Sequence, residues 1–109
     1  MVELDLVVED PEDIMKVVEA LSSITRLNIL RLLYEEELSV TELSERLHLS
    51  KGTVSTHITA LERAGLVETS YAPGAKGVKK VIRPKVDKVI LVLKPSGGLK
   101  EPDEEGRWP

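Results

Sequence analysis

The chain has 109 residues, of which 41% are hydrophobic and 31% charged, so we expect one compact domain with a buried core. It contains no cysteine, which excludes disulfides, thiolate zinc sites and cysteine nucleophiles. Aromatic residues make up only 3%, which argues against modules that stack single-stranded bases on aromatic rings. No apolar run reaches the roughly 20 residues of a membrane span, and the acidic start lacks a signal-peptide pattern. We therefore expect a cytoplasmic protein without a membrane partner.

The net charge of −4 is unevenly distributed along the chain. Residues 50–85 contain seven basic and two acidic residues, a local net charge of +5, whereas residues 1–49 contain twelve acidic and four basic residues. Binding to nucleic acid depends on the local patch more than on the total charge. The basic segment is therefore a candidate site, although chance also produces such segments.

The first half of the chain predicts one strand and two helices. Apolar and acidic residues alternate over 2–8, which is typical of a strand. Asp10 and Pro11 are a favourable cap and first residue for a helix over about 11–22. A leucine-rich helix follows from Ile24 and ends in the acidic run at residues 35–37.

The next unit is a pair of helices joined by a tight turn. Thr41 is a candidate cap for a short helix over 41–47, and the turn at 48–50 offers Leu49 as its buried anchor. Ser50 caps a helix that reaches Ala64. The apolar residues of this helix recur on one side: Val54, Ile58 and Leu61. Its opposite side and flank carry small polar or basic residues: Gly52, Thr53, Thr56, His57, Thr59 and Arg63.

Strands and a tail follow the helices. Gly65 ends the second helix of the pair, and residues 66–71 and 78–83 predict a β-hairpin around a turn-rich segment at 72–77. A further strand is expected over 88–93. Residues 95–109 are rich in proline, glycine and acid, and predict a flexible tail.

Three runs in this order resemble the ArsR-type winged helix-turn-helix regulators, and archaeal proteins of this kind in particular. They are SSITRLNILRLL, SVTELSERLHLSKGTVSTHITALERAGLVE and YAPGAKGVKK. The resemblance covers about residues 10–93. It implies an α+β winged helix-turn-helix with about four helices and a hairpin wing.

The resemblance also implies which residues contact double-stranded DNA, and on which element each lies. The expected contacts of the recognition helix are Ser50, Lys51, Gly52, Thr53, Ser55, Thr56, His57 and Arg63. The expected contacts of the wing are Lys76, Lys79, Lys80 and Arg83. For His57, the alternative is an ordinary helix-surface histidine.

The chain departs from the metal-sensing members of that class. It has no cysteine, and its two histidines, His48 and His57, both lie in the helix-turn-helix. We therefore expect no metal site and no cofactor, and no effector is implied. Neither a catalytic carboxylate pair nor a nucleophile elbow is evident, so we do not expect an enzyme.

The terminal segments offer material for a dimer interface. Winged-helix regulators commonly double their phosphate contacts by two-fold symmetry. We expect residues 1–94 to form the DNA-binding domain, with dimerisation segments at 1–22 and 86–94, whose strands pair in one sheet. The sequence thus predicts a homodimeric, sequence-specific transcriptional regulator, with a repressor as the first expectation. The main alternative is a winged helix that binds protein instead of DNA.

Overall fold

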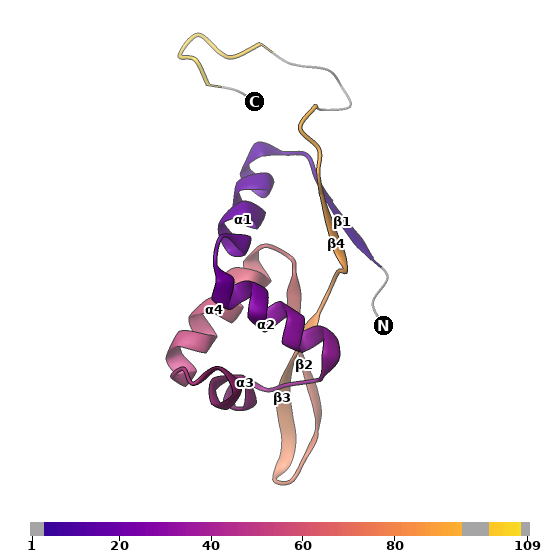
Figure 1. The fold of residues 1–109 in the computed structure, drawn as a ribbon. Coiled ribbons are helices and arrows are strands. Elements are labelled where there is room, and N and C mark those ends of the chain that lie inside the picture. Colours follow the sequence, from indigo (N-terminus) through magenta and orange to yellow (C-terminus); the bar gives the residue numbers. More distant parts are fainter. Residues whose placement is uncertain (1–3, 95–100, 108–109) are drawn as a thin grey trace.

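The computed structural model describes residues 4–94 and 101–107, and Figure 1 traces them. The elements follow the predicted order: β1 (Asp5–Val8), α1 (Pro11–Leu21), α2 (Ile24–Glu35), α3 (Val40–Leu47), α4 (Lys51–Arg63), β2 (Val67–Gly74), β3 (Gly77–Pro84) and β4 (Lys88–Leu91). These four helices and the β2–β3 hairpin confirm the predicted winged helix-turn-helix.

Side-chain caps determine where the helices begin. The Asp10 carboxylate accepts the Glu12 backbone N–H at 2.9 Å at the start of α1, and Ser23 caps α2. At the start of α3 the predicted cap, Thr41, is wrong. Ser39 takes that place in a capping box, in which its hydroxyl accepts the Glu42 N–H and the Glu42 carboxylate accepts the Ser39 N–H.

The turn between α3 and α4 has the tight geometry that the sequence predicted. His48 closes α3 in the left-handed region at φ 56°, and the Ser50 hydroxyl accepts the Thr53 N–H at 3.1 Å. At the far end of α4, Gly65 has φ 78°, and the N–H groups of Gly65 and Leu66 donate to the carbonyls of Glu62 and Leu61. This is the glycine-ended Schellman motif, which turns the chain directly into β2.

The wing is longer and its turn tighter than predicted. The segment at 72–77 is not a loop, because β2 continues to Gly74, which pairs with Gly77 across a two-residue turn. A Cβ at position 74 would lie 2.9 Å from the Lys79 Cβ, so the close approach of the strands requires glycine there. The Ile82 N–H also donates to the Leu38 carbonyl, which adds a third, one-residue strand to the wing.

The terminal strands pair with each other in parallel, from Asp5 with Lys88 to Val8 with Leu91. Both are shorter than the predicted 2–8 and 88–93, and residues 1–3 lie outside the described part. The expected tail lies partly outside it too. Its described residues contain a local turn, in which the Asp103 carboxylate accepts the backbone N–H groups of Glu105 and Arg107.

The core contains aliphatic side chains from all four helices and from the wing. Its fully buried members are Val17, Ile29, Leu43, Val54, Leu61, Val81 and Ile82. Each helix also carries exposed residues, so each is buried in the core on one side and open to solvent on the other. Packing of one stripe per helix therefore fixes which face of α4 points outward.

We expect Ser39→Ala to lower the free energy of unfolding by about 1 kcal/mol, because the capping box loses its hydroxyl. Thr41→Ala is the matched control at an exposed position, and we expect it to change stability by less than about 0.5 kcal/mol. Urea denaturation of both variants measures the difference. Equal effects of the two substitutions would contradict the assignment of Ser39 as the cap.

Candidate nucleic-acid interface

The polar face of α4 lies on the surface of the molecule. Val54, Ile58 and Leu61 are at most 3% exposed and hold the helix in the core. The predicted contacts at the start and middle of the helix are exposed, namely Ser50, Lys51, Gly52, Thr53, Ser55 and Thr56, and so is Arg63 at its end. Seven of the eight residues predicted for the recognition helix are therefore exposed, and His57 is the exception.

The hydroxyl groups of this face are ordered by the helix itself. The Thr56 hydroxyl donates to the Gly52 carbonyl at 3.0 Å, and the Thr59 hydroxyl donates to the Ser55 carbonyl at 2.9 Å. Each oxygen can still accept a hydrogen bond. At Gly52 a Cβ would meet nothing nearer than the Ser50 hydroxyl at 4.0 Å, so the first turn is open to an approaching ligand.

His57 is half-buried and is bonded to an arginine that the sequence analysis did not select. Its Nδ1 accepts a hydrogen bond from Arg26 Nε at 3.0 Å. Burial, together with the positive charge of Arg26, lowers the pKa of His57 below its ordinary value of 6.5. The imidazole is therefore neutral at neutral pH. Arg26 lies on α2, 31 positions away, so no local pattern could have revealed the contact.

Two of the four predicted wing cations are paired with carboxylates. Lys79 Nζ forms an ion pair with Glu42, and this hydrogen bond is the main reason why the pKa of Glu42 lies below 4.5. Arg83 Nη2 lies 2.8 Å from Glu37 Oε2. These pairs tie β3 to α3 and to the end of α2. The net positive charge of the wing is therefore lower than a count of its basic residues suggests.

The other two wing cations are exposed. Lys76 lies in the two-residue turn, and Lys80 lies opposite Tyr71 in the hairpin. Neither has an ion pair within residues 4–94 and 101–107. Tyr71 is 68% exposed, and as the cross-strand partner of Lys80 it shares a face of the hairpin with it. The sequence analysis placed Tyr71 in a strand and did not select it as a contact, and its exposure beside Lys80 makes it a further candidate.

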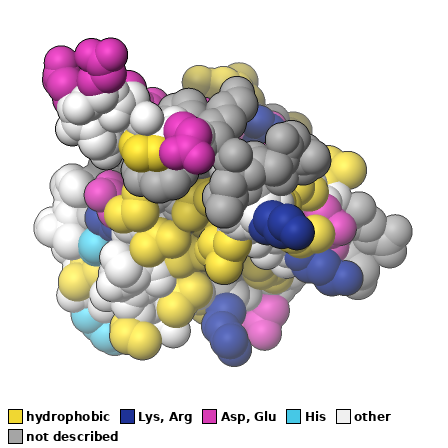
Figure 2. Space-filling view, turned by 90° about the horizontal axis from the view of Figure 1, so that it is seen from above, with side chains coloured by type: hydrophobic (Ala, Val, Ile, Leu, Met, Phe, Trp, Pro, Cys, Tyr) yellow, Lys and Arg dark blue, Asp and Glu magenta, His cyan; other side chains and the backbone are white. Residues whose placement is uncertain are grey.

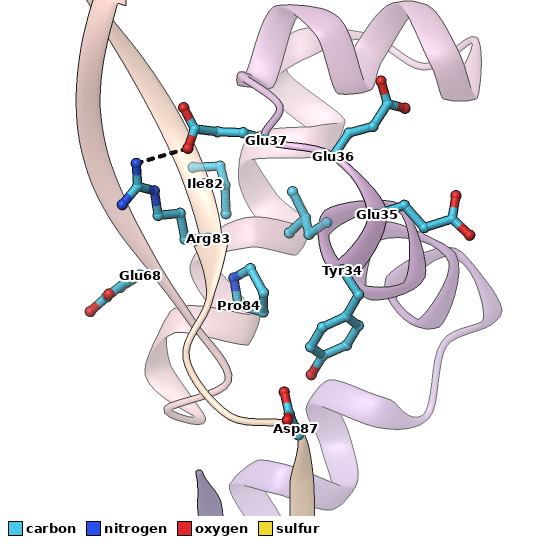
Figure 3. Close-up of a pocket in the computed structure, with 10 residues that line it drawn as sticks. Tyr34, Glu35, Glu36, Glu37, Glu68, Ile82, Arg83, Pro84 and Asp87 are labelled. Atoms are coloured by element: carbon cyan, nitrogen blue, oxygen red, sulfur yellow. Dashed lines mark hydrogen bonds and ion pairs between the residues drawn. The ribbon is translucent and has the colours of Figure 1, made fainter. Parts of the chain in front are cut away.

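A surface hollow of about 680 Å³ lies between the end of α2 and the base of the wing (Figure 3). Its lining includes Glu35, Glu36, Glu37, Glu68 and Asp87, so it would repel a phosphate backbone. The Tyr34 hydroxyl donates to the Val86 carbonyl at its edge. Burial and the nearby Asp87 raise the pKa of Tyr34 above 10.0.

Other kinds of site find no support in the part of the chain that the structure describes. Among these residues, no group of three or more histidine, aspartate or glutamate side chains is arranged to hold a metal ion. None of the described helices is both long and apolar enough to cross a bilayer.

The helix pair α3–α4 with its exposed polar second helix, followed by the basic β2–β3 hairpin, defines the class: a winged helix-turn-helix protein. Residues 23–69 match the profile described as "Bacterial regulatory protein, arsR family". An uncharacterized HTH-type transcriptional regulator of Methanocaldococcus jannaschii is 34% identical over 79 residues, which span 72% of this chain and 83% of that protein. The chain belongs to the ArsR family of regulatory proteins.

Further relatives include proteins of solved structure. The transcriptional activator HlyU of Vibrio cholerae is 49% identical over 51 residues, 47% of this chain, and the match spans only about half (47%) of that protein. A HlyU structure from Vibrio cholerae superposes with a TM-score of 0.56 at 35% identity, over 68% of this chain and 76% of that one. A homodimeric winged helix-turn-helix DNA-binding domain of Mycobacterium bovis gives a TM-score of 0.59 at 28% identity, with coverages of 68% and 65%. The curated relatives are transcriptional regulators.

We expect the free energy of unfolding to fall as the pH is lowered from about 7.5 to about 5.5. The pKa of His57 is lower in the folded protein than in the unfolded chain, so the unfolded state binds the proton first and gains stability below about pH 6.5. Urea denaturation across this range measures the effect. The Glu42 carboxylate remains ionised over this range, because its pKa lies below 4.5.

His57→Gln is the control for that titration, because glutamine is neutral throughout. We expect this variant to lose most of the decrease in stability between the two pH values. An unchanged decrease would show that His57 is not its source.

Proposed function

We propose that this protein binds double-stranded DNA as a homodimer and thereby regulates transcription. The observation that carries the proposal is the exposed hydroxyl-rich face of α4, which is held in place by Val54, Ile58 and Leu61 behind it. The sequence predicts a repressor first, whereas the relative HlyU is described as a transcriptional activator.

The chemistry of this face suits a base-reading helix. The major groove is about 12 Å wide, and it admits a helix only if the side chains on the entering face leave room. Gly52, Ser55 and Thr56 are small. The Ser55 hydroxyl can donate to or accept from base edges, and the Thr56 hydroxyl, which donates to the Gly52 carbonyl, can accept from them. Lys51 in the first turn and Arg63 at the last residue are exposed cations suited to phosphates at the rims of the groove.

The wing supplies a second contact. Lys76 at the turn and Lys80 on β3 are exposed and without ion pairs among the described residues, so they are the favoured phosphate contacts. Lys79 and Arg83 contribute less charge, since Glu42 and Glu37 already neutralise them. They instead hold the hairpin in its orientation relative to the helices.

Exposed apolar residues on α1 and the terminal strands support the homodimer. On α1, Met15 is 52% and Val18 is 41% exposed. On the strands, Val7 is 56%, Ile90 is 44% and Leu91 is 40% exposed. Figure 2 views the end of the molecule that carries these elements, and hydrophobic side chains gather there in one area. A soluble monomer rarely leaves such a patch open.

The β1–β4 sheet also supports a second copy as the partner. Two-stranded parallel sheets are rarely stable without cover on both faces. A shallow hollow of about 400 Å³ between α1 and β4, lined by Val18, Leu21 and Val89 among others, is available to apolar side chains of the second copy. We therefore retain 1–22 and 86–94 as the dimerisation segments. The Mycobacterium bovis relative is described as homodimeric and DNA-binding, in accord with this proposal.

We expect DNA binding to weaken with salt, with log K falling by about 0.9 per phosphate contact for each unit of log salt. Lys80→Ala should weaken binding to all duplexes. It should also reduce the magnitude of this slope by about 0.9 for each phosphate contact that is lost. Lys79→Ala should have a smaller effect on the slope, because its partner is Glu42. Fluorescence anisotropy at several salt concentrations, with a duplex selected from a random pool, measures both.

Two comparisons make this test decisive. Lys88→Ala removes the same charge from β4, which Figure 1 shows toward the end of the molecule opposite the wing tip, and should leave the slope unchanged. Failure of the wild-type protein to select any duplex would overturn the proposal. It would favour the alternative of a winged helix that binds protein.

We expect Val18→Glu and Ile90→Glu each to convert the dimer into a folded monomer. Both residues are exposed in the single chain, so a charge costs the monomer little but cannot be buried between two copies. Light scattering measures the mass, and circular dichroism confirms the fold. Val78→Glu on the wing, where the side chain is 75% exposed, is the matched control and should remain dimeric. Dimeric V18E and I90E, or a monomeric wild type, would refute this interface.

A further inference from the structure

Three helices meet at the side chain of Arg26, which lies in the first turn of α2. Its Nε donates to His57 Nδ1 in the middle of α4 at 3.0 Å. Its Nη1 donates to the Glu19 carbonyl in the last turn of α1 at 3.1 Å. The same carbonyl accepts the backbone N–H and the hydroxyl of Ser22, which end α1. One guanidinium therefore connects the end of α1 to the DNA-facing helix.

We propose that Arg26 is a positioning residue for DNA recognition, which holds His57 as the neutral tautomer with its proton on Nε2 and ties it to the end of α1. This inference rests on the proposed function. Arg26 lies on α2 and does not belong to the exposed face of α4.

The tautomer follows from the chemistry of the two partners. A guanidinium has donors only, so the nitrogen that faces Arg26 Nε must present a lone pair. The ring proton of a neutral imidazole is then on Nε2. His57 therefore offers one N–H donor to a ligand, and donors of this kind pair with guanine N7 and O6, adenine N7, thymine O4 or a phosphate.

The two bonds of Arg26 require the planar fork of a guanidinium. Nε and Nη1 are fixed in one plane and donate to two different acceptors at the same time. A lysine retains the charge, but its single ammonium group on a flexible stem has no fixed second donor. The acceptor of Nη1, the Glu19 carbonyl, lies on α1, and the exposed face of α1 is part of the proposed dimer interface. Two hydrogen bonds of Arg26 thus connect His57 with the helix that carries the proposed subunit contact.

The first arm of the test needs no DNA. The ¹⁵N shifts of the imidazole ring, measured on the free protein, distinguish the two neutral tautomers. We expect a single Nε2–H tautomer for His57 in the wild type, and a mixture in Arg26→Met together with a higher His57 pKa. Arg31→Met is the matched control, because it removes an exposed arginine from the same helix and should change neither reading.

The second arm is a double-mutant cycle on a duplex selected by the wild-type protein. If Arg26 acts through His57, R26M and His57→Ala each lower the affinity about tenfold, and the double variant lowers it by the same factor. If Arg26 merely stabilises the fold, the two losses of affinity are independent, and the double variant binds about a hundredfold more weakly than the wild type. Arg26→Lys serves if R26M does not fold, as judged by circular dichroism, and it should also lose affinity.

The outcomes separate the two proposals. A wild type that binds no duplex overturns the proposed function and, with it, the role of Arg26 in recognition. A wild type that binds, with additive losses or with the tautomer unchanged in R26M, overturns only the positioning role. Wild-type affinity in R26K would overturn the need for two donors in one plane.

Discussion

The orientation of α4 depends on the burial of one narrow stripe, formed by Val54, Ile58 and Leu61. These side chains pack into a core that includes Leu43 of α3 and Ile29 of α2, so rotation of α4 would expose apolar surface and bury hydroxyls. The face that would turn inward also carries Arg63, and burying its charge without a partner would cost far more than burying a hydroxyl that the helix already satisfies. The polar face is therefore held outward by the core, and the remaining features of the proposed DNA surface follow from that orientation.

Acidic residues organise the basic segment as well as offsetting its charge. Glu37 and Glu42 bind Arg83 and Lys79, and Glu42 also completes the cap of α3. Each of these pairs is partly exposed, so its contribution to stability is small. Its larger effect is on orientation, because the hairpin is attached to α3 and to the end of α2 through the same carboxylates. A protein with net charge −4 can thus present a local positive surface while its own carboxylates attract the wing and hold it in place.

The helix α1 has one buried side and one exposed side. Val17 and Ala20 are 2% exposed and belong to the core, whereas Met15 and Val18 on the same helix are open to solvent. Its last turn receives Arg26, which in turn bonds His57 on α4. The structure therefore connects the surface proposed for the second copy with the surface proposed for DNA through core packing and two hydrogen bonds.

The sequence by itself determined the order of the elements and the exposed face of α4, because these depend on local periodicity, caps and glycine, and it indicated the fold class through its resemblance to a known family. Gly65 and Ser50 are examples, since each acts within its own turn. The cap at Ser39 was missed because Thr41 and Ser39 are both good cap residues, and the choice depends on where the preceding chain joins the wing at Leu38. Only the tertiary structure decided which basic residues stay unpaired and that Arg26 reaches His57, because these contacts join residues 31 to 46 positions apart.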